Sequence, residues 1–135
     1  LEHLRGALAG KIVVSLVVPL TFSEGKASSL QVQEGSATLQ AQSILTDSSI
    51  VAAFQNTSAN DLLNLDTTIE SDVLVCSDDM LAKATIMELA EKIRSVRAVD
   101  CGGLENSRYV EDLTALLINI NRIHHRNSSI RLVGI

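Results

Sequence analysis

Apolar and polar positions follow one another along this chain in two different periods. Short runs rich in β-branched residues fit buried strands, whereas longer stretches with apolar residues three or four apart fit helices. The first run, "LAGKIVVSLVVPL" at 8–20, is nearly continuous and ends at Pro19. Such a run is typical of a strand buried on both faces, as in the middle of a parallel sheet.

Four more runs predict strands, and the stretches between them predict helices. The strands are "SIVAAF" (49–54), "DVLVC" (72–76), "VRAVD" (96–100) and the closing "IRLVGI" (130–135); the helices cover 1–9, 36–45, 58–65, 82–93 and 107–123. Residues 21–35 are rich in Ser, Gly, Lys and Gln and predict a surface loop. Because strands and helices alternate, the pattern predicts an α/β fold with a largely parallel sheet.

The helix predicted over 107–123 is apolar around most of its circumference. Its apolar positions are Val110, Leu113, Leu116, Leu117, Ile118, Ile120 and Ile123. A small domain seldom buries such a helix on all sides, so a second subunit or a partner domain is expected to cover it. A helix at the centre of the core is the alternative.

Composition narrows the classes of protein that this chain can represent. With 135 residues, 46% hydrophobic and 20% charged, it has the size and balance of one globular domain. A net charge of −5 and only three aromatic residues argue against a nucleic-acid partner. No apolar run reaches the roughly 20 residues of a membrane span. The two widely spaced cysteines and the lack of a visible signal peptide predict a cytoplasmic location without a membrane partner.

Three pairs of reactive side chains each allow a structural and a chemical interpretation. Asp78 and Asp79 either bind a metal or share a proton, or they cap the helix that follows them. His124–His125 lacks further residues at ligand spacing and predicts a solvated loop. Cys76 and Cys101 each end a strand and are either reactive or small buried residues. No pattern assigns a catalytic or a metal-binding residue.

Loops that follow the carboxyl ends of the strands are the better candidates for a binding site. In open α/β sheets ligands bind at this edge. The loops are Val17–Leu20, Gln55–Ser58, Ser77–Asp79 and Cys101–Leu104. They offer backbone N–H groups, the Gln55 and Asn56 amides and two adjacent glycines, but no strong acid or base. This chemistry suits a ligand that is held rather than hydrolysed.

Five segments in order carry a resemblance to a known family. They are "KIVVSLVVPL", "VAAFQNTSANDLLNLD", "SDVLVCSDD", "RAVDCGGLENSRYVEDLTALLININ" and "IRLVGI". Together they resemble the C-terminal part of the NADPH-dependent reductases of the deazaflavin coenzyme F-420, the F-420:NADP oxidoreductases. The resemblance covers nearly the whole chain and is densest between 49 and 121.

The resemblance implies a domain organisation and two cofactors. Family members begin with a Rossmann half whose Gly-rich turn cradles the NADP pyrophosphate, and this sequence has no G-x-G-x-x-G. Residues 1–20 would be the last helix and strand of a truncated NADP-binding Rossmann domain. Residues 21–135 would be the smaller C-terminal domain, which contacts coenzyme F-420 and forms a homodimer. NADP would bind only with the missing half, present in a longer chain or in a partner.

By resemblance, three loops and one serine would contact the deazaflavin. They are Val17, Val18 and Pro19, then Gln55, Asn56, Thr57 and Ser58, then Gly102, Gly103 and Leu104, and finally Ser128. In this family a hydride passes directly between C5 of the deazaflavin and C4 of the nicotinamide, so no catalytic side chain is implied.

The sequence also departs from the family pattern. Family members commonly have Pro where Leu16, Gly103 and Ala115 stand, often Gly at Ser77, and frequently His at Gln55. Because prolines restrict the backbone in advance, their loss affects ligand affinity more than the fold. The chain by itself is expected to be inactive. The alternative hypothesis is a non-catalytic oligomerisation or docking module derived from the same family.

Overall fold

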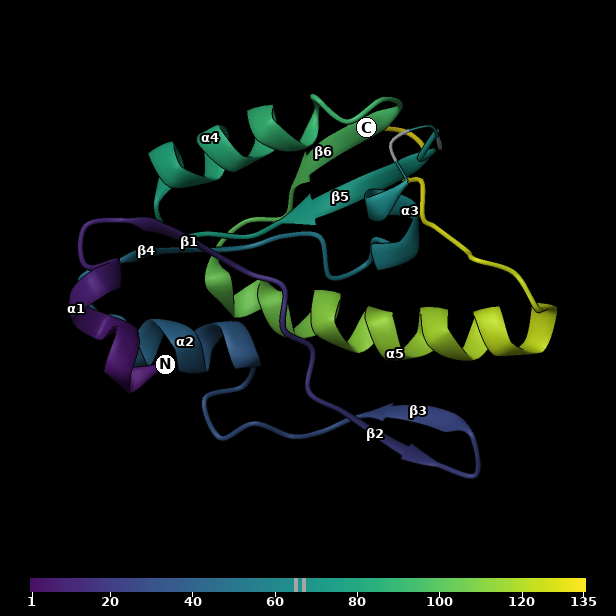
Figure 1. The fold of residues 1–135 in the computed structure, drawn as a ribbon, viewed down its shortest axis with the longest axis horizontal. Helices are drawn as coiled ribbons and strands as arrows, with labels where there is room; N and C mark the ends of the chain where they lie inside the picture. The colour runs from purple at the N-terminus through teal and green to yellow at the C-terminus, as the bar shows by residue number, and fades with distance from the viewer. Residues whose placement is uncertain (65, 67) are drawn as a thin grey trace.

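The chain folds as an α/β structure in which short strands alternate with helices (Figure 1). The computed structural model describes residues 1–64, 66 and 68–135. In chain order the elements are η1 (Glu2–Leu4), α1 (Arg5–Leu8), β1 (Ile12–Ser15), β2 (Leu20–Ser23), β3 (Lys26–Ser29), α2 (Ala37–Ile44), β4 (Ser49–Ala52), α3 (Ala59–Leu63), β5 (Ser71–Val75), α4 (Met80–Ala90), β6 (Val96–Asp100), η2 (Leu104–Asn106) and α5 (Ser107–His124). The predicted fold class is confirmed.

Two parallel strand pairs form the centre of the molecule. β1 pairs with β4 and β5 pairs with β6, each in parallel register. An isolated antiparallel bridge between Ala52 and Cys76 joins β4 to β5, through backbone N···O distances of 2.9 and 3.0 Å. The β1–β4 pair therefore runs opposite to the β5–β6 pair.

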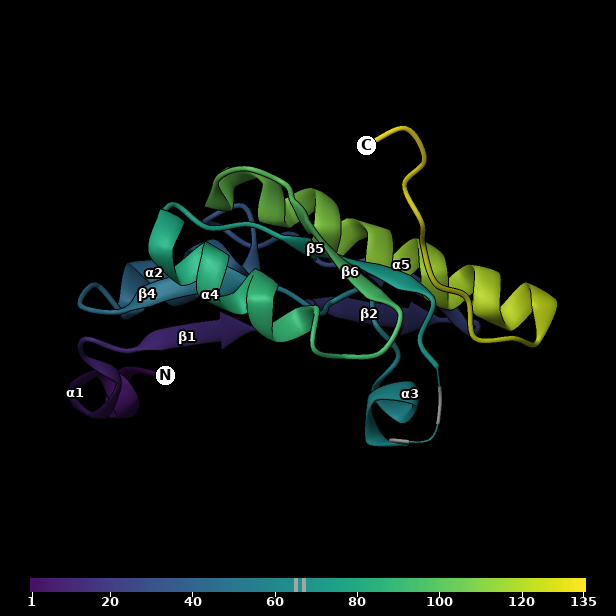
Figure 2. The same ribbon diagram turned by 90° about the horizontal axis from the view of Figure 1, so that it is seen from above.

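Helices cover both faces of the β5–β6 pair, as Figure 2 shows. On one face, Ala82, Ile86 and Ala90 of α4 pack against Val73 and Val75 of β5 and against neighbouring strand residues. On the other face, α5 packs through Val110 against Ala52, Leu74, Cys76 and Val99. Strand residues alternate between the two clusters because successive side chains in a strand point to opposite faces. The core is thus divided by the sheet.

β1 is not the strand buried on both faces that its apolar run predicts. It covers only Ile12–Ser15, and its burial rises from exposed at Ile12 to buried at Ser15. The run continues into Leu16 and Val17, which are exposed outside the strand. The reason is that β1 has a partner strand on one side only, β4, within the part of the chain that the structure describes.

Residues 21–35 are not the continuous surface loop that their polarity predicts. β2 and β3 form an antiparallel hairpin there, closed by Glu24 and Gly25, whose φ angles of 49° and 76° are those of a two-residue hairpin turn. Only Ala27 of the eight strand residues is buried. The Asn119 side chain of α5 holds it by accepting from Ala27 N at 2.9 Å and donating to Ala27 O at 2.8 Å.

The closing segment "IRLVGI" is not a strand, although it lies beside β5. Asp72 N donates to Ile130 O at 2.8 Å, but the next bonds come from side chains: Leu132 N donates to the Asp72 carboxylate at 2.7 Å, and Arg97 donates to Leu132 O at 2.6 Å. A buried carboxylate and a guanidinium thus take the place of a strand ladder.

The predicted helices are present with modest changes at their ends. Ser36 and Ser58 cap α2 and α3 through their hydroxyl oxygens. Leu65, where the prediction ended α3, lies outside the described residues. Gly10 follows α1 with φ 71°, as expected of a residue that ends a helix. Across the described ranges, no helix is long and apolar enough to cross a membrane.

Candidate functional site

A small cavity lies where the chain leaves β4 and passes under α5. It measures about 100 Å³ and is lined by Gln55, Asn56, Thr57, Ser58, Thr114, Leu117, Ile118, Asn121 and Ser128. Five of these residues, the Gln55–Ser58 loop and Ser128, belong to the set that the sequence predicts for ligand contact. Residues far apart in the sequence therefore meet around one cavity.

The backbone of the Gln55–Ser58 loop is held in place by its own turn and by its neighbours. Phe54 adopts φ 68°, and Thr57 N donates to Phe54 O at 3.0 Å, which closes a tight turn after β4. The Thr114 hydroxyl of α5 donates to Gln55 O at 3.0 Å. The loop is therefore fixed against α5 before any ligand binds.

Both polar atoms of the Asn56 side-chain amide form hydrogen bonds within the fold. The side chain is buried, its Nδ2 donates to Asp72 O at 2.7 Å, and its Oδ1 accepts from Leu74 N at 3.5 Å. These bonds tie the loop to β5 and leave the amide without a free polar atom. Asn56 thus shapes the cavity and does not offer its own hydrogen bonds to it.

Gln55 and Thr57 each carry a buried polar atom at the cavity. Gln55 donates through Nε2 to Ser15 O at 2.9 Å, but its Oε1 and the Thr57 Oγ1 have no hydrogen-bond partner in the part of the chain that the structure describes. Buried polar atoms are almost always hydrogen-bonded, so each such exception needs an explanation. A bound ligand with matching polar groups would explain both unpaired atoms.

Asn121 and Ser128 close the other side of the cavity. Asn121 Oδ1 accepts from Ser128 N at 2.6 Å and from the Ser128 hydroxyl. The sequence prediction named Ser128 but missed Thr114 and Asn121. A signal for them exists, because they are polar positions seven residues apart on α5 and so share one face.

The Val17–Pro19 segment lies near this site without lining the cavity. It follows β1 directly, and the Gln55–Ser15 hydrogen bond joins the end of β1 to the cavity loop. Val17 is exposed, whereas Val18 and Pro19 are half-buried.

The Gly102–Leu104 segment lies at the opposite end of the β4–β5 junction. Ser77 N donates to Gly102 O at 3.1 Å, and the Ser77 hydroxyl donates to Ile50 O at 2.7 Å, near the start of β4. The expectation that all carboxyl-end loops meet at one edge is therefore not met. The antiparallel bridge turns the ends of β5 and β6 away from the end of β4.

Asp78 and Asp79, the acidic pair after β5, accept hydrogen bonds from backbone N–H groups of the fold. Asp79 Oδ1 accepts from Leu81 N and Ala82 N, each at 3.0 Å, and thus caps α4. Asp78 accepts from Leu104 N at 2.9 Å. These hydrogen bonds at the helix terminus, with one from Ser49, hold the pKa of Asp79 below its usual range. Among the residues with described positions, no group of three or more His, Cys, Asp and Glu side chains could hold a metal ion.

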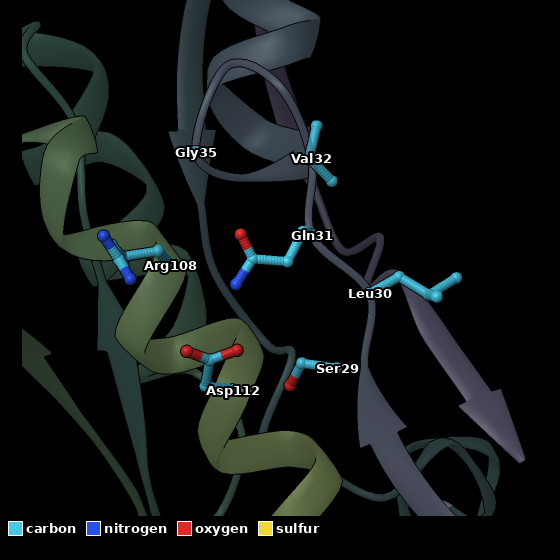
Figure 3. Close-up of a pocket in the computed structure, with 7 residues that line it drawn as sticks. All are labelled: Ser29, Leu30, Gln31, Val32, Gly35, Arg108 and Asp112. Carbon is cyan, nitrogen blue, oxygen red and sulfur yellow. The ribbon is translucent and has the colours of Figure 1, made fainter. Parts of the chain in front are cut away.

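A second hollow of about 90 Å³ lies between the 29–35 segment and α5 (Figure 3). Gln31 reaches toward α5, where Arg108 and Asp112 lie one turn apart, whereas Leu30 and Val32 point away. The polar side chains here are exposed, and none belongs to the predicted set. Water satisfies such groups, so this hollow makes a weaker candidate than the cavity at Gln55–Ser58.

Comparison with known proteins gives a consistent result. The whole chain matches proteins named F420-dependent NADP reductase from Methanocaldococcus jannaschii, Methanothermobacter marburgensis and Methanothermobacter thermautotrophicus, at 39% identity in each case. The match covers 62%, 62% and 60% of those proteins.

The resemblance to F420-dependent NADP reductases is confirmed.

The fold agrees with that result. A crystal structure described as a putative F420-dependent NADP reductase from Arthrobacter sp. FB24 superposes with a TM-score of 0.84 at 23% identity, covering 96% of this chain and 61% of that one. No protein-family model matches the chain. The chain therefore spans about three fifths of the length of the F420-dependent NADP reductases that it matches.

Proposed function

We propose that this chain supplies the deazaflavin-contacting part of an F420-dependent NADP reductase, an oxidoreductase that moves a hydride between NADP(H) and coenzyme F-420. The observation that carries the proposal is the cavity in which Gln55–Ser58 and Ser128 meet. When bound, the deazaflavin supplies the ring carbon that takes or gives the hydride. The protein's task is to orient that ring and exclude water from it.

The free polar atoms of the cavity fit one edge of such a ring. A deazaflavin edge carries carbonyl oxygens and an N–H group; Gln55 Oε1 accepts, and the Thr57 hydroxyl both donates and accepts. At about 100 Å³ the cavity is smaller than the several hundred Å³ of a complete ligand pocket. The ring would therefore insert only its polar edge, with the rest lying across the opening toward Val17–Pro19.

A further segment is needed to bind NADP. The second side of β1 supports this part of the proposal, because it has no partner strand among the described residues and an unpaired strand edge can pair with another strand. Beside it is an open, apolar hollow of about 450 Å³, lined by Val14, Leu16, Phe54, Leu62, Leu89, Lys92 and Ile93. We propose that a Rossmann half, in a longer chain or in a partner, pairs with β1 and covers this hollow.

We also propose that two copies of the chain associate through α5. Tyr109, Leu116 and Ile123 are 63, 55 and 63% exposed and stand seven residues apart, so they form one apolar stripe along the helix. A repeat of seven is the spacing at which two helices pack along each other. Both cysteines are free, which fits the reducing cytoplasm, where we place the proposed dimer.

Replacing Thr57 by Val tests the site, because it removes the unpaired hydroxyl while keeping the shape. Titration of coenzyme F-420 by fluorescence is expected to show binding weaker by about 1–3 kcal/mol, the cost of leaving a ligand atom unpaired. The stability to urea is expected to be unchanged or higher, since no protein hydrogen bond is lost.

Thr21→Val, on the exposed strand β2, is the matched control and should change neither quantity. Equal dissociation constants for wild type and Thr57→Val would place the ring elsewhere. A chain that binds no coenzyme at all would favour the non-catalytic docking module.

A further inference from the structure

Two cysteine thiols lie next to each other at the ends of β5 and β6. Val75 pairs with Asp100 in the parallel register, and the ladder continues because Cys101 N donates to Val75 O at 2.8 Å. Cys76 and Cys101 are therefore the next neighbours across the two strands. Both are free cysteines, and they are the only two in the sequence.

Their side chains point to the same face of the sheet. Leu74, Cys76 and Val99 belong to the cluster under α5, and Cys101 packs against that cluster. Neighbouring strands lie about 4.7–4.9 Å apart, which is within the Cα separation of about 4.4–6.8 Å that a disulfide spans. The backbone is therefore already placed for a bond between the two sulfurs.

The two thiols have different surroundings and different reactivity. Cys76 is fully buried, whereas Cys101 is half-buried and can be reached from solvent. The neighbouring Cys76 thiol lowers the pKa of Cys101, and contact with Cys101 together with burial raises the pKa of Cys76. As a neutral thiol, Cys101 donates weakly to Val99 O at 3.6 Å. Since the thiolate is the reactive form, Cys101 is the nucleophile of the pair.

Charged neighbours surround the Cys101 end of β6. Lys83 Nζ lies 2.7 Å from Asp100 Oδ1 and 3.1 Å from Gly102 O, so one ammonium group is bound at this strand end. The ammonium favours a thiolate and the Asp100 carboxylate opposes it. The neighbouring Cys76 thiol is therefore the main group that favours the Cys101 thiolate.

We propose that Cys101 and Cys76 form a dithiol site that reacts with small-molecule disulfides and closes into an intramolecular disulfide. The Cys101 thiolate attacks one sulfur of the small disulfide, forms a mixed disulfide and releases one small thiolate. Cys76 then loses its proton, attacks the Cys101 sulfur and expels the second thiolate. One small disulfide is thus reduced to two thiols, and two protein thiols are oxidised to one disulfide. The site is independent of the proposed hydride transfer.

Mass spectrometry of the 135-residue chain with glutathione disulfide under anaerobic conditions tests this proposal. Wild type should end as a species lighter by two hydrogen atoms, with a Cys76–Cys101 cross-link in the peptide map. Cys76→Ala should stop at one glutathionyl adduct because the resolving thiol is absent. Cys101→Ser should react at least about tenfold more slowly, since only the buried, poorly ionised thiol remains. Dithiothreitol should reverse both products.

A stable glutathionyl adduct on wild type, or disulfides only between chains, would overturn the proposal. Circular dichroism of each variant separates a lost reaction from a lost fold. If a variant does not fold, the wild-type peptide map still decides, because the cross-link either forms within the chain or does not.

Discussion

Asp72 shows how one residue can organise three segments of this molecule. Its side chain is fully buried, yet Arg97 donates to both carboxylate oxygens, at 2.6 and 2.9 Å, and Arg131 and Leu132 N bind it at 3.2 and 2.7 Å. Burying an unpaired charge is costly, so these bonds are what allow a carboxylate inside β5. They also hold the closing segment against the sheet.

This site predicts a loss of stability in acid. Hydrogen bonds from Arg97 lower the pKa of Asp72 from 3.8 to about 2. Because the folded pKa is the lower one, the stabilisation is complete above about pH 5 and disappears as the pH falls toward about 2. Urea unfolding across this range should show a steep loss for wild type and a shallower one for Asp72→Asn. Asp112→Asn, on the exposed side of α5, should keep the wild-type slope.

At the scale of elements, Glu111 connects two helices. It lies buried on α5, and its carboxylate accepts from Ala37 N at 2.9 Å, Thr38 N at 3.1 Å and the Thr38 hydroxyl at 2.9 Å, all at the start of α2. The first N–H groups of a helix have no partner within it and favour negative charge. One helix thus caps another, and the cap fixes α2 beside α5.

Replacing Glu111 by Gln is expected to destabilise the fold by about 1–3 kcal/mol. The variant removes the charge and turns an NH₂ group toward donors, which leaves buried N–H groups unpaired. Urea unfolding measures the effect, and Glu88→Gln on the exposed face of α4 is the matched control. Equal losses of unfolding free energy in the two variants would show that the Glu111 carboxylate has no special role at the start of α2.

At the scale of the whole molecule, α5 carries one set of residues that the fold needs and another set that we expect a second subunit to cover. Leu117 is 7% exposed and faces the cavity, whereas its neighbour Leu116 is 55% exposed and belongs to the outer stripe. Leu116→Glu should therefore convert the proposed dimer to a folded monomer in light scattering. Leu117→Lys should instead unfold the chain, because it places a charge in the core. Met80→Glu, at an exposed apolar position on α4, should change neither.

The 135-residue chain is also expected to show no NADPH-dependent reduction of coenzyme F-420. Positioning NADP depends on a Gly-rich phosphate turn that the sequence does not contain. The measurement is the loss of coenzyme absorbance on adding NADPH. Steady turnover that boiling abolishes would contradict the prediction. Recovery of activity on adding the N-terminal half of an F420-dependent NADP reductase would support it.

The sequence by itself determined most elements that have a strong local signal. The strands at 49–54, 72–76 and 96–100 and the helix from Ser107 are all present, because hydrophobic period acts within one element. The hairpin at 20–29 was missed because only one of its strand residues is buried, which leaves no alternating pattern.

Only the tertiary structure decided which predicted site residues meet. The direction of β5 relative to β4 depends on pairs such as Ala52–Cys76 and Asn56–Asp72, which lie far apart in the chain. That direction brings Ser128 to the Gln55–Ser58 loop and sends Gly102–Leu104 to the other end of the junction. The tertiary structure also determines that the Asn56 amide binds the backbone of β5, whereas the Thr57 hydroxyl has no partner among the described residues. A local pattern records which face of a strand is apolar, but contacts between distant residues select its partner and its direction.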